Sequence, residues 1–297
     1  MISQERVEGI VAWTEEWGDR EACEMYHITP ETLARYKRLA NRQPNRQPKI
    51  LLFDIETAPN LVYTWGLWDQ NISLSQIVAP AYVICWSAKW LFDDEVMSDC
   101  MTKSEALAED DEGIMQTIWQ LLDECDVCIG HNSDKFDLPW VNGRFLLYGM
   151  PPPSPYRSID TLKAAKRFYL PSRKLDYLGK EFVGYQKIKT DFDLWKGCMM
   201  GNKDSLNEMM RYNKKDVQLL EDVYLKFRPW IKSHPNLGLY YASDEERCSN
   251  CGSTNLTEMG KMYYTDVNAY KAYRCECGAI VRVRHSGKAA ELRGVAR

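Results

Sequence analysis

Two carboxylates interrupt an apolar, strand-like run in this chain. In Ile-Leu-Leu-Phe-Asp-Ile-Glu, residues 50–56, Asp54 and Glu56 are two positions apart. Side chains two apart on a β-strand project from the same face, so the two acids would stand together. Two negative charges on a buried face repel each other, and a cation between them would offset this repulsion. This run has no lysine or arginine that could supply the positive charge. The pair predicts a divalent metal site; the alternative is a strand end at which both acids reach solvent.

Two later segments carry acids that could join this pair. A short apolar run at 127–130 reads as a buried strand, and Asp137 follows it near the expected start of a helix. Open α/β sheets place ligands at this carboxyl end of their strands. In an expected helix at 205–227, Tyr212 and Asp216 are four residues apart and share one face. Four carboxylates are enough to hold two Mg²⁺ ions.

In order and spacing, these three segments resemble the exonuclease motifs of the DEDD superfamily of 3′ to 5′ exonucleases, which have the ribonuclease H-like fold. The tyrosine resembles that of the DEDDy branch, which includes proofreading domains of family A and family B DNA polymerases. The resemblance covers about residues 50–232. It implies that two Mg²⁺ or Mn²⁺ ions are bound by Asp54, Glu56, Asp137 and Asp216.

The same resemblance implies roles for other residues. Tyr212 would orient the attacking water and complete the catalytic set. Asn132 and Phe136 would support the site or contact the terminal nucleotide. Asp134 is the rival of Asp137, which is preferred because the family has phenylalanine just before the ligand.

Prolines and hydrophobic spacing divide the chain into parts. A tandem Asn-Arg-Gln-Pro repeat predicts a linker at 41–48. Before it, residues 1–40 contain three helical segments, and the last two resemble the helix-turn-helix of homeodomain-like bacterial and phage proteins. The alternative is a three-helix docking module without DNA contact. Residues 49–232 alternate strand and helix signals, which predicts an α/β domain with a mixed five-stranded sheet flanked by helices. The strands are expected at 49–55, 82–91, 95–101, 127–130 and 158–161.

Two pairs of cysteines have the spacing of metal ligands. Each pair is followed by glycine, so that backbone amides can turn toward the sulfurs, and four thiolates suit a tetrahedral zinc ion. The segment 243–285 resembles a zinc ribbon, with Cys-x-Cys where the second pair is usually Cys-x-x-Cys. One structural Zn²⁺ is therefore expected on Cys248, Cys251, Cys275 and Cys277. A basic tail follows at 286–297.

Charge and hydropathy narrow the function classes. The net charge of −4 argues against a protein that coats nucleic acid non-specifically, although two local stretches, 35–49 and 271–297, are basic. The apolar stretches are too short to span a bilayer, so a soluble, cytoplasmic protein of a bacterium or phage-infected cell is expected. The arrangement of modules resembles phage or mobile-element proteins.

The expected function is a metal-dependent 3′–5′ exonuclease acting on DNA by a two-metal-ion mechanism. Its substrates would be single strands or recessed 3′ ends, and its partner a separate polymerase or replication protein. One alternative is a 3′–5′ exoribonuclease, because recognition of the 2′-hydroxyl depends on a few pocket contacts. The other is a catalytically silent DNA-binding adaptor on the same fold.

Overall fold

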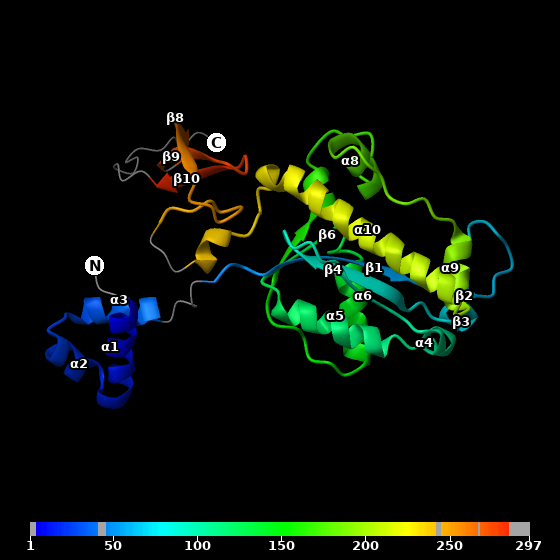
Figure 1. Cartoon of the computed structure of the whole chain (residues 1–297), viewed down its shortest axis with the longest axis horizontal. Coiled ribbons are helices and arrows are strands. Elements are labelled where there is room, and N and C mark those ends of the chain that lie inside the picture. The colour runs from blue at the N-terminus through cyan, green and yellow to red at the C-terminus, as the bar shows by residue number, and fades with distance from the viewer. Residues whose placement is uncertain (1–3, 41–45, 242–244, 267, 285–297) are drawn as a thin grey trace, which may run out of the picture. The chain divides into compact units, whose positions relative to one another are not determined.

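The computed structural model describes residues 4–40, 46–241, 245–266 and 268–284 (Figure 1). The predicted basic tail and most of the predicted linker, residues 41–45, lie outside the described residues. Contacts divide the chain into two compact units, one of residues 1–47 and 236–256 and the other of residues 48–235 and 257–297. Within the described ranges, no helix has both the length and the apolar character needed to cross a membrane.

Three short helices form the N-terminal part of the first unit, as predicted. They are α1 (Gln4–Trp17), α2 (Asp19–Tyr26) and α3 (Pro30–Ala40). The hydroxyl of Thr29 accepts the N–H of Thr32 at 3.2 Å and so caps the start of α3. Lys37 of α3 forms an ion pair with Asp19 of α2. A small apolar core between the helices consists of Val7, Ile10, Ala22, Leu33 and Tyr36.

The second unit contains the predicted mixed five-stranded sheet, in the order β5-β4-β1-β6-β7. Strands β1, β6 and β7 are parallel, whereas β4 runs antiparallel to both β1 and β5. The strands are β1 (Ile50–Thr57), β4 (Val83–Trp90), β5 (Met97–Cys100), β6 (Val127–Gly130) and β7 (Arg157–Asp160). All five predicted strands are therefore confirmed, with ends that differ by up to two residues.

Helices cover both faces of this sheet (Figure 1). On one side α10 (Lys203–Phe227) packs against β1, β4 and β5, and on the other α5 (Glu112–Glu124) packs against β4 and β5. The remaining helices are α4 (Lys103–Ala108), α6 (Asp137–Leu147), α7 (Thr161–Ala165), α8 (Leu175–Phe182) and α9 (Phe192–Met199). A hairpin of β2 (Leu61–Val62) and β3 (Ile77–Ala79), absent from the sequence prediction, connects β1 to β4.

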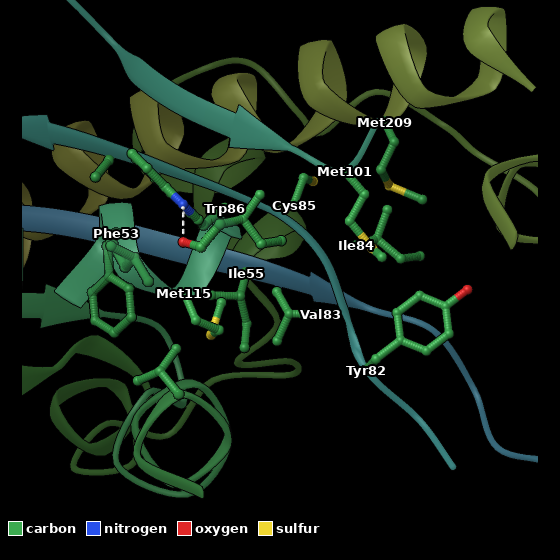
Figure 2. Packing of buried hydrophobic residues seen from close by; sticks show 14 of the residues in the cluster. Phe53, Ile55, Tyr82, Val83, Ile84, Cys85, Trp86, Met101, Met115 and Met209 are labelled. Carbon is green, nitrogen blue, oxygen red and sulfur yellow. Dashed lines mark hydrogen bonds between the residues drawn. The ribbon is translucent and has the colours of Figure 1, made fainter. Parts of the chain in front are cut away.

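Alternation along β1 separates its apolar and acidic side chains. Phe53 and Ile55 point toward Met115 of α5 in the buried core (Figure 2). Trp86 of β4 fixes this layer, because its indole N–H donates to the carbonyl of Ile114 at 2.9 Å. Residues two apart share a face, so the acids of β1 project from the opposite face, toward α10.

The C-terminal three-stranded sheet has the order β10-β9-β8. Its strands are β8 (Leu256–Tyr264), β9 (Ala269–Cys275) and β10 (Ile280–Arg284). The sequence predicted only two of them, because β10 follows the second cysteine pair after a tight turn. In this sheet the guanidinium of Arg282 lies over the rings of Tyr263 and Tyr270, 4.7 and 4.4 Å from their centroids.

Candidate active site

Three carboxylates meet between β1 and α10. One oxygen each from Asp54, Glu56 and Asp216 lies within 4.8 Å of the other two. Asp54 and Glu56 come from the α10-facing side of β1, and Asp216 comes from the middle of α10 and is fully buried. Three of the four predicted metal ligands are thus brought together by two elements that are far apart in the sequence.

Asp137 stands beside this group, at the first position of α6. Its Oδ1 accepts the backbone N–H of Ile55, between the two acids of β1, at 3.2 Å. The pairing of β1 with β6 ends at Leu52, so β1 continues past its parallel neighbour. The N–H groups on that side of β1 then need another acceptor, and Asp137 supplies one. The side chain is almost completely buried.

The rival acid, Asp134, is engaged elsewhere. Its Oδ2 accepts from the ammonium of Lys163 at 2.6 Å, and the hydroxyl of Ser158 donates to its other oxygen. It therefore belongs to an ion pair beside β7, which leaves Asp137 as the acid of this segment that contacts β1.

Lys187, which the sequence analysis did not single out, reaches into the acidic group. Its ammonium forms an ion pair with Asp216 and donates to the hydroxyl of Tyr212 at 3.2 Å. The same ammonium lies 5.2 Å from the centroid of the Tyr212 ring. Lys187 is in the loop between α8 and α9, where no periodic pattern marks it, so only the tertiary structure places it here.

Asn213 is a second residue that sequence reasoning missed. Its Nδ2 donates to Oδ2 of Asp54 at 2.7 Å, and the residue is fully buried. The sequence does contain a pattern that indicates Asn213. It is three residues before Asp216 on the same helix, so both side chains lie on the same helix face. Asn213 fixes the orientation of Asp54 as an outer partner of a metal ligand does.

The surroundings of the four acids favour their protonated forms. Loss of solvation raises the pKa of Asp54 well above its usual range, and the charge of Asp137 raises it further. Burial raises the pKa of Glu56 to about 8 and that of Asp137 to about 7. Burial also raises the pKa of Asp216, although the charge of Lys187 opposes this. One ammonium is thus too little positive charge for four clustered carboxylates.

The donor set fits divalent cations of the Mg²⁺ class. All of the ligand atoms are carboxylate oxygens, which hard cations prefer. Both oxygens of Asp216 are buried, and neither accepts a hydrogen bond of regular geometry, although the Lys187 ammonium lies against one of them. A buried carboxylate with unused lone pairs and like-charged neighbours is the arrangement that a bound cation would satisfy.

The turn after β6 holds the two remaining predicted residues. Asn132 has a left-handed backbone, with φ of 69°, and its N–H donates to Oδ1 of Asp160 at 2.9 Å. Its carbonyl accepts the N–H groups of Lys135 and Phe136, so the main chain of Asn132 shapes the turn. The partly exposed ring of Phe136 lies just before Asp137, with its centroid 6.3 Å from that of Trp140.

A second cluster, apart from the acids, consists of four cysteines. Their sulfur atoms lie within 4.8 Å of one another: Cys248, Cys251, Cys275 and Cys277. Gly252 and Gly278 follow the two pairs in left-handed conformations, with φ of 77° and 88°, which explains the glycine after each pair. The N–H of Asn250 points to the sulfur of Cys248 at 3.4 Å. Four sulfur ligands of this kind are typical of a structural zinc site.

Comparison with known proteins supports the assignment of the fold. A family model described as the RNase_H superfamily matches residues 84–228, from β4 to the end of α10. The matched range includes Asp137, Tyr212 and Asp216, whereas the acids of β1 precede it. No curated protein matches the chain. Residues 84–228 are thus similar to the RNase H superfamily, and the five-stranded mixed sheet with acids at its centre is RNase H-like.

Proposed function

We propose that this protein is a metal-dependent exonuclease that removes nucleotides from the 3′ end of DNA. The observation that carries the proposal is the meeting of Asp54, Glu56 and Asp216 within 4.8 Å, with Asp137 beside them. These four acids would hold two Mg²⁺ or Mn²⁺ ions. When bound, such ions supply an activated water and stabilise the leaving oxygen of a phosphodiester.

The other residues of the site position the reactants in this proposal. Tyr212 shares a helix face with Asp216, and its hydroxyl would orient the attacking water by a hydrogen bond. Asn213 holds the carboxylate of Asp54 in one orientation. The exposed part of the Phe136 ring is available to the terminal nucleotide, next to the first turn of α6.

The small flanking modules support DNA as the substrate. The helices α2 and α3 are joined by a tight turn, as in a helix-turn-helix, and α3 carries Arg35 on its surface. A scaffold that only binds DNA has no need for four acids whose burial opposes their ionisation, so the site favours an enzyme over a silent adaptor.

End-labelled substrates test the proposal directly. The full chain is incubated with Mg²⁺ and single-stranded DNA, recessed-end duplex DNA or RNA of one sequence. A 5′ label should give a descending ladder on DNA, while a 3′ label should appear at once as a mononucleotide. A ladder only on RNA would show that RNA, not DNA, is the substrate. If no strand is cleaved, the protein would instead be the catalytically silent DNA-binding adaptor.

A hydroxyl deletion separates the role of Tyr212 from its packing. Tyr212→Phe keeps the ring and should lower the turnover number about tenfold or more, with nearly unchanged substrate binding. Tyr169→Phe, at a fully exposed tyrosine, serves as the matched control and should leave turnover unchanged. Equal turnover of Tyr212→Phe and the parent protein would remove the tyrosine from the mechanism.

A further inference from the structure

The hairpin between β1 and β4 displays large apolar side chains to solvent. Trp65 is fully exposed, and Trp68 and Tyr63 are 83% and 76% exposed. Leu67 and Leu74, on the same segment, are similarly exposed. Scattered exposed apolar residues are ordinary, but several large ones on one short segment mark a surface that another molecule covers. We call the three rings of Tyr63, Trp65 and Trp68 the aromatic platform.

The backbone that carries the platform is held by its own hydrogen bonds. Tyr63 N–H donates to the carbonyl of Gln76 at 2.9 Å, and Nε2 of Gln76 donates back to the carbonyl of Tyr63 at 2.9 Å. The hydroxyl of Thr64 donates to the Gly66 carbonyl at 2.9 Å, and Nε2 of Gln70 donates to that of Trp68 at 2.6 Å. Polar side chains thus hold the hairpin while its aromatic rings face outward.

The hairpin starts at the end of the sheet that carries the acids. Glu56 is paired with Cys85, and the next pair, Thr57 with Val83, is the last between β1 and β4. Ala58 N–H then donates to the carbonyl of Tyr82 at 2.8 Å and closes the base of the hairpin. The platform therefore extends the β1–β4 pair beyond the acids, and Tyr63 follows Glu56 by only seven residues.

The chemistry of the segment indicates what covers it. Residues 58–88 contain no lysine or arginine and one acid, Asp69, so the segment has no charge with which to hold phosphates. Flat aromatic faces bind the faces of nucleotide bases, which stack on them with little regard to sequence. A strand that ends at the acids could place its unpaired bases on these rings while its phosphates face elsewhere.

We propose that Tyr63, Trp65 and Trp68 stack on the bases of a single-stranded nucleic acid whose 3′ end lies at the acidic site. This rests on the proposed function for the position of the 3′ end, but binding itself needs no catalysis. The platform would favour single strands over duplexes, because paired bases already stack on one another.

Binding in EDTA tests the platform without the nuclease reaction. Fluorescently labelled 12-nucleotide oligo-dT, oligo-U and a blunt duplex are each titrated with the full chain. The anisotropy of the label measures binding. Both single strands should bind, the duplex more weakly. Trp65→Leu combined with Trp68→Leu should weaken single-strand binding about tenfold or more, whereas the two Trp→Phe changes should retain most of it. Tyr169→Ala, at a fully exposed tyrosine after α7, is the control and should bind as the parent does.

Three outcomes would overturn the proposal. They are failure of the parent to bind single strands, equal binding by the leucine and parent proteins, and equal binding of the duplex. Light scattering that shows a dimer lost in the leucine variant would assign the platform to a second copy of the chain instead. The p-nitrophenyl ester of thymidine 5′-phosphate has a single base and needs no stacked strand, so it tests the nuclease separately from the platform. Failure of the parent to hydrolyse it would count against the nuclease alone.

Discussion

The ammonium of Lys187 forms an ion pair with Asp216, a carboxylate that is fully buried in α10. The same ammonium donates to the hydroxyl of Tyr212, so one loop lysine contacts two of the proposed catalytic residues. Without metal, Lys187 is the positive charge that offsets the acids. A divalent cation bound by Asp216 must therefore share that carboxylate with the lysine or displace it.

Replacing Lys187 by methionine should lower the Tm of the metal-free protein and enlarge the increase in Tm that Mg²⁺ produces. Removing one partner of a buried ion pair leaves the other charge uncompensated, so the Tm in EDTA should fall. Mg²⁺ no longer competes with the ammonium, so the increase in Tm that saturating Mg²⁺ produces should be larger than in the parent. Thermal unfolding with and without Mg²⁺ measures both effects. Lys189→Met, at an exposed lysine of the same loop, is the control, and an equal Mg²⁺ shift in all three proteins would contradict the competition.

Removing an acid should separate activity from stability. Asp54→Asn and Asp216→Asn each delete one proposed metal ligand without opening a cavity, so activity should fall about a hundredfold or more. Because the buried acids destabilise one another, the Tm of Asp54→Asn in EDTA should equal or exceed that of the parent. Its response to Mg²⁺ should be much smaller. A variant that digests DNA at the parental rate would show that Asp54 holds no essential metal.

The sequence predicted those parts of the site that follow a local period. Asp54 and Glu56 could be placed on one face because strands repeat every two residues, and Tyr212 with Asp216 because helices repeat every 3.6. Such patterns predict which side chains share one face of a strand or helix, but not which other element that face contacts. The contact between β1 and α10 was predicted only from the family resemblance. Asn213 was within reach of the same helical argument, since it lies between those two residues.

Lys187 and the aromatic hairpin could not be predicted in this way. Lys187 belongs to a loop without periodicity, and its backbone is positioned by a tertiary hydrogen bond from its N–H to Oδ1 of Asp176 at 3.0 Å. The hairpin leaves apolar side chains exposed, which reverses the usual relation between hydropathy and burial on which sequence reasoning depends. Both features are specified by contacts between distant segments or by function, not by local sequence.

Stability of the metal-free protein should fall as the pH rises. Folding raises the pKa of Glu56 from 4.5 to about 8, so between these values the folded protein binds a proton that the unfolded chain releases. The free energy of unfolding therefore decreases from about pH 5 to pH 8 in EDTA. Mg²⁺ binds the ionised acids, so its stabilising effect should increase over the same range. Urea unfolding at several pH values measures this, and Glu56→Gln should flatten the decline; an identical slope in that variant would exclude Glu56 as its source.

The cysteine cluster predicts one zinc ion per chain. Cys248 and Cys275 are buried, and their sulfurs lie within 4.8 Å of those of Cys251 and Cys277. Because the segment 243–285 is short, it has little apolar core of its own. The metal should therefore supply much of its folding free energy. Elemental analysis of freshly prepared, reduced protein should find close to one zinc per chain, with Cys275→Ser losing it and becoming sensitive to protease between residues 243 and 285. Cys23→Ser, at a half-buried cysteine of α2, should keep the zinc. A parent protein without zinc, or a Cys275→Ser protein that retains it, would show that these four sulfurs do not form the metal site.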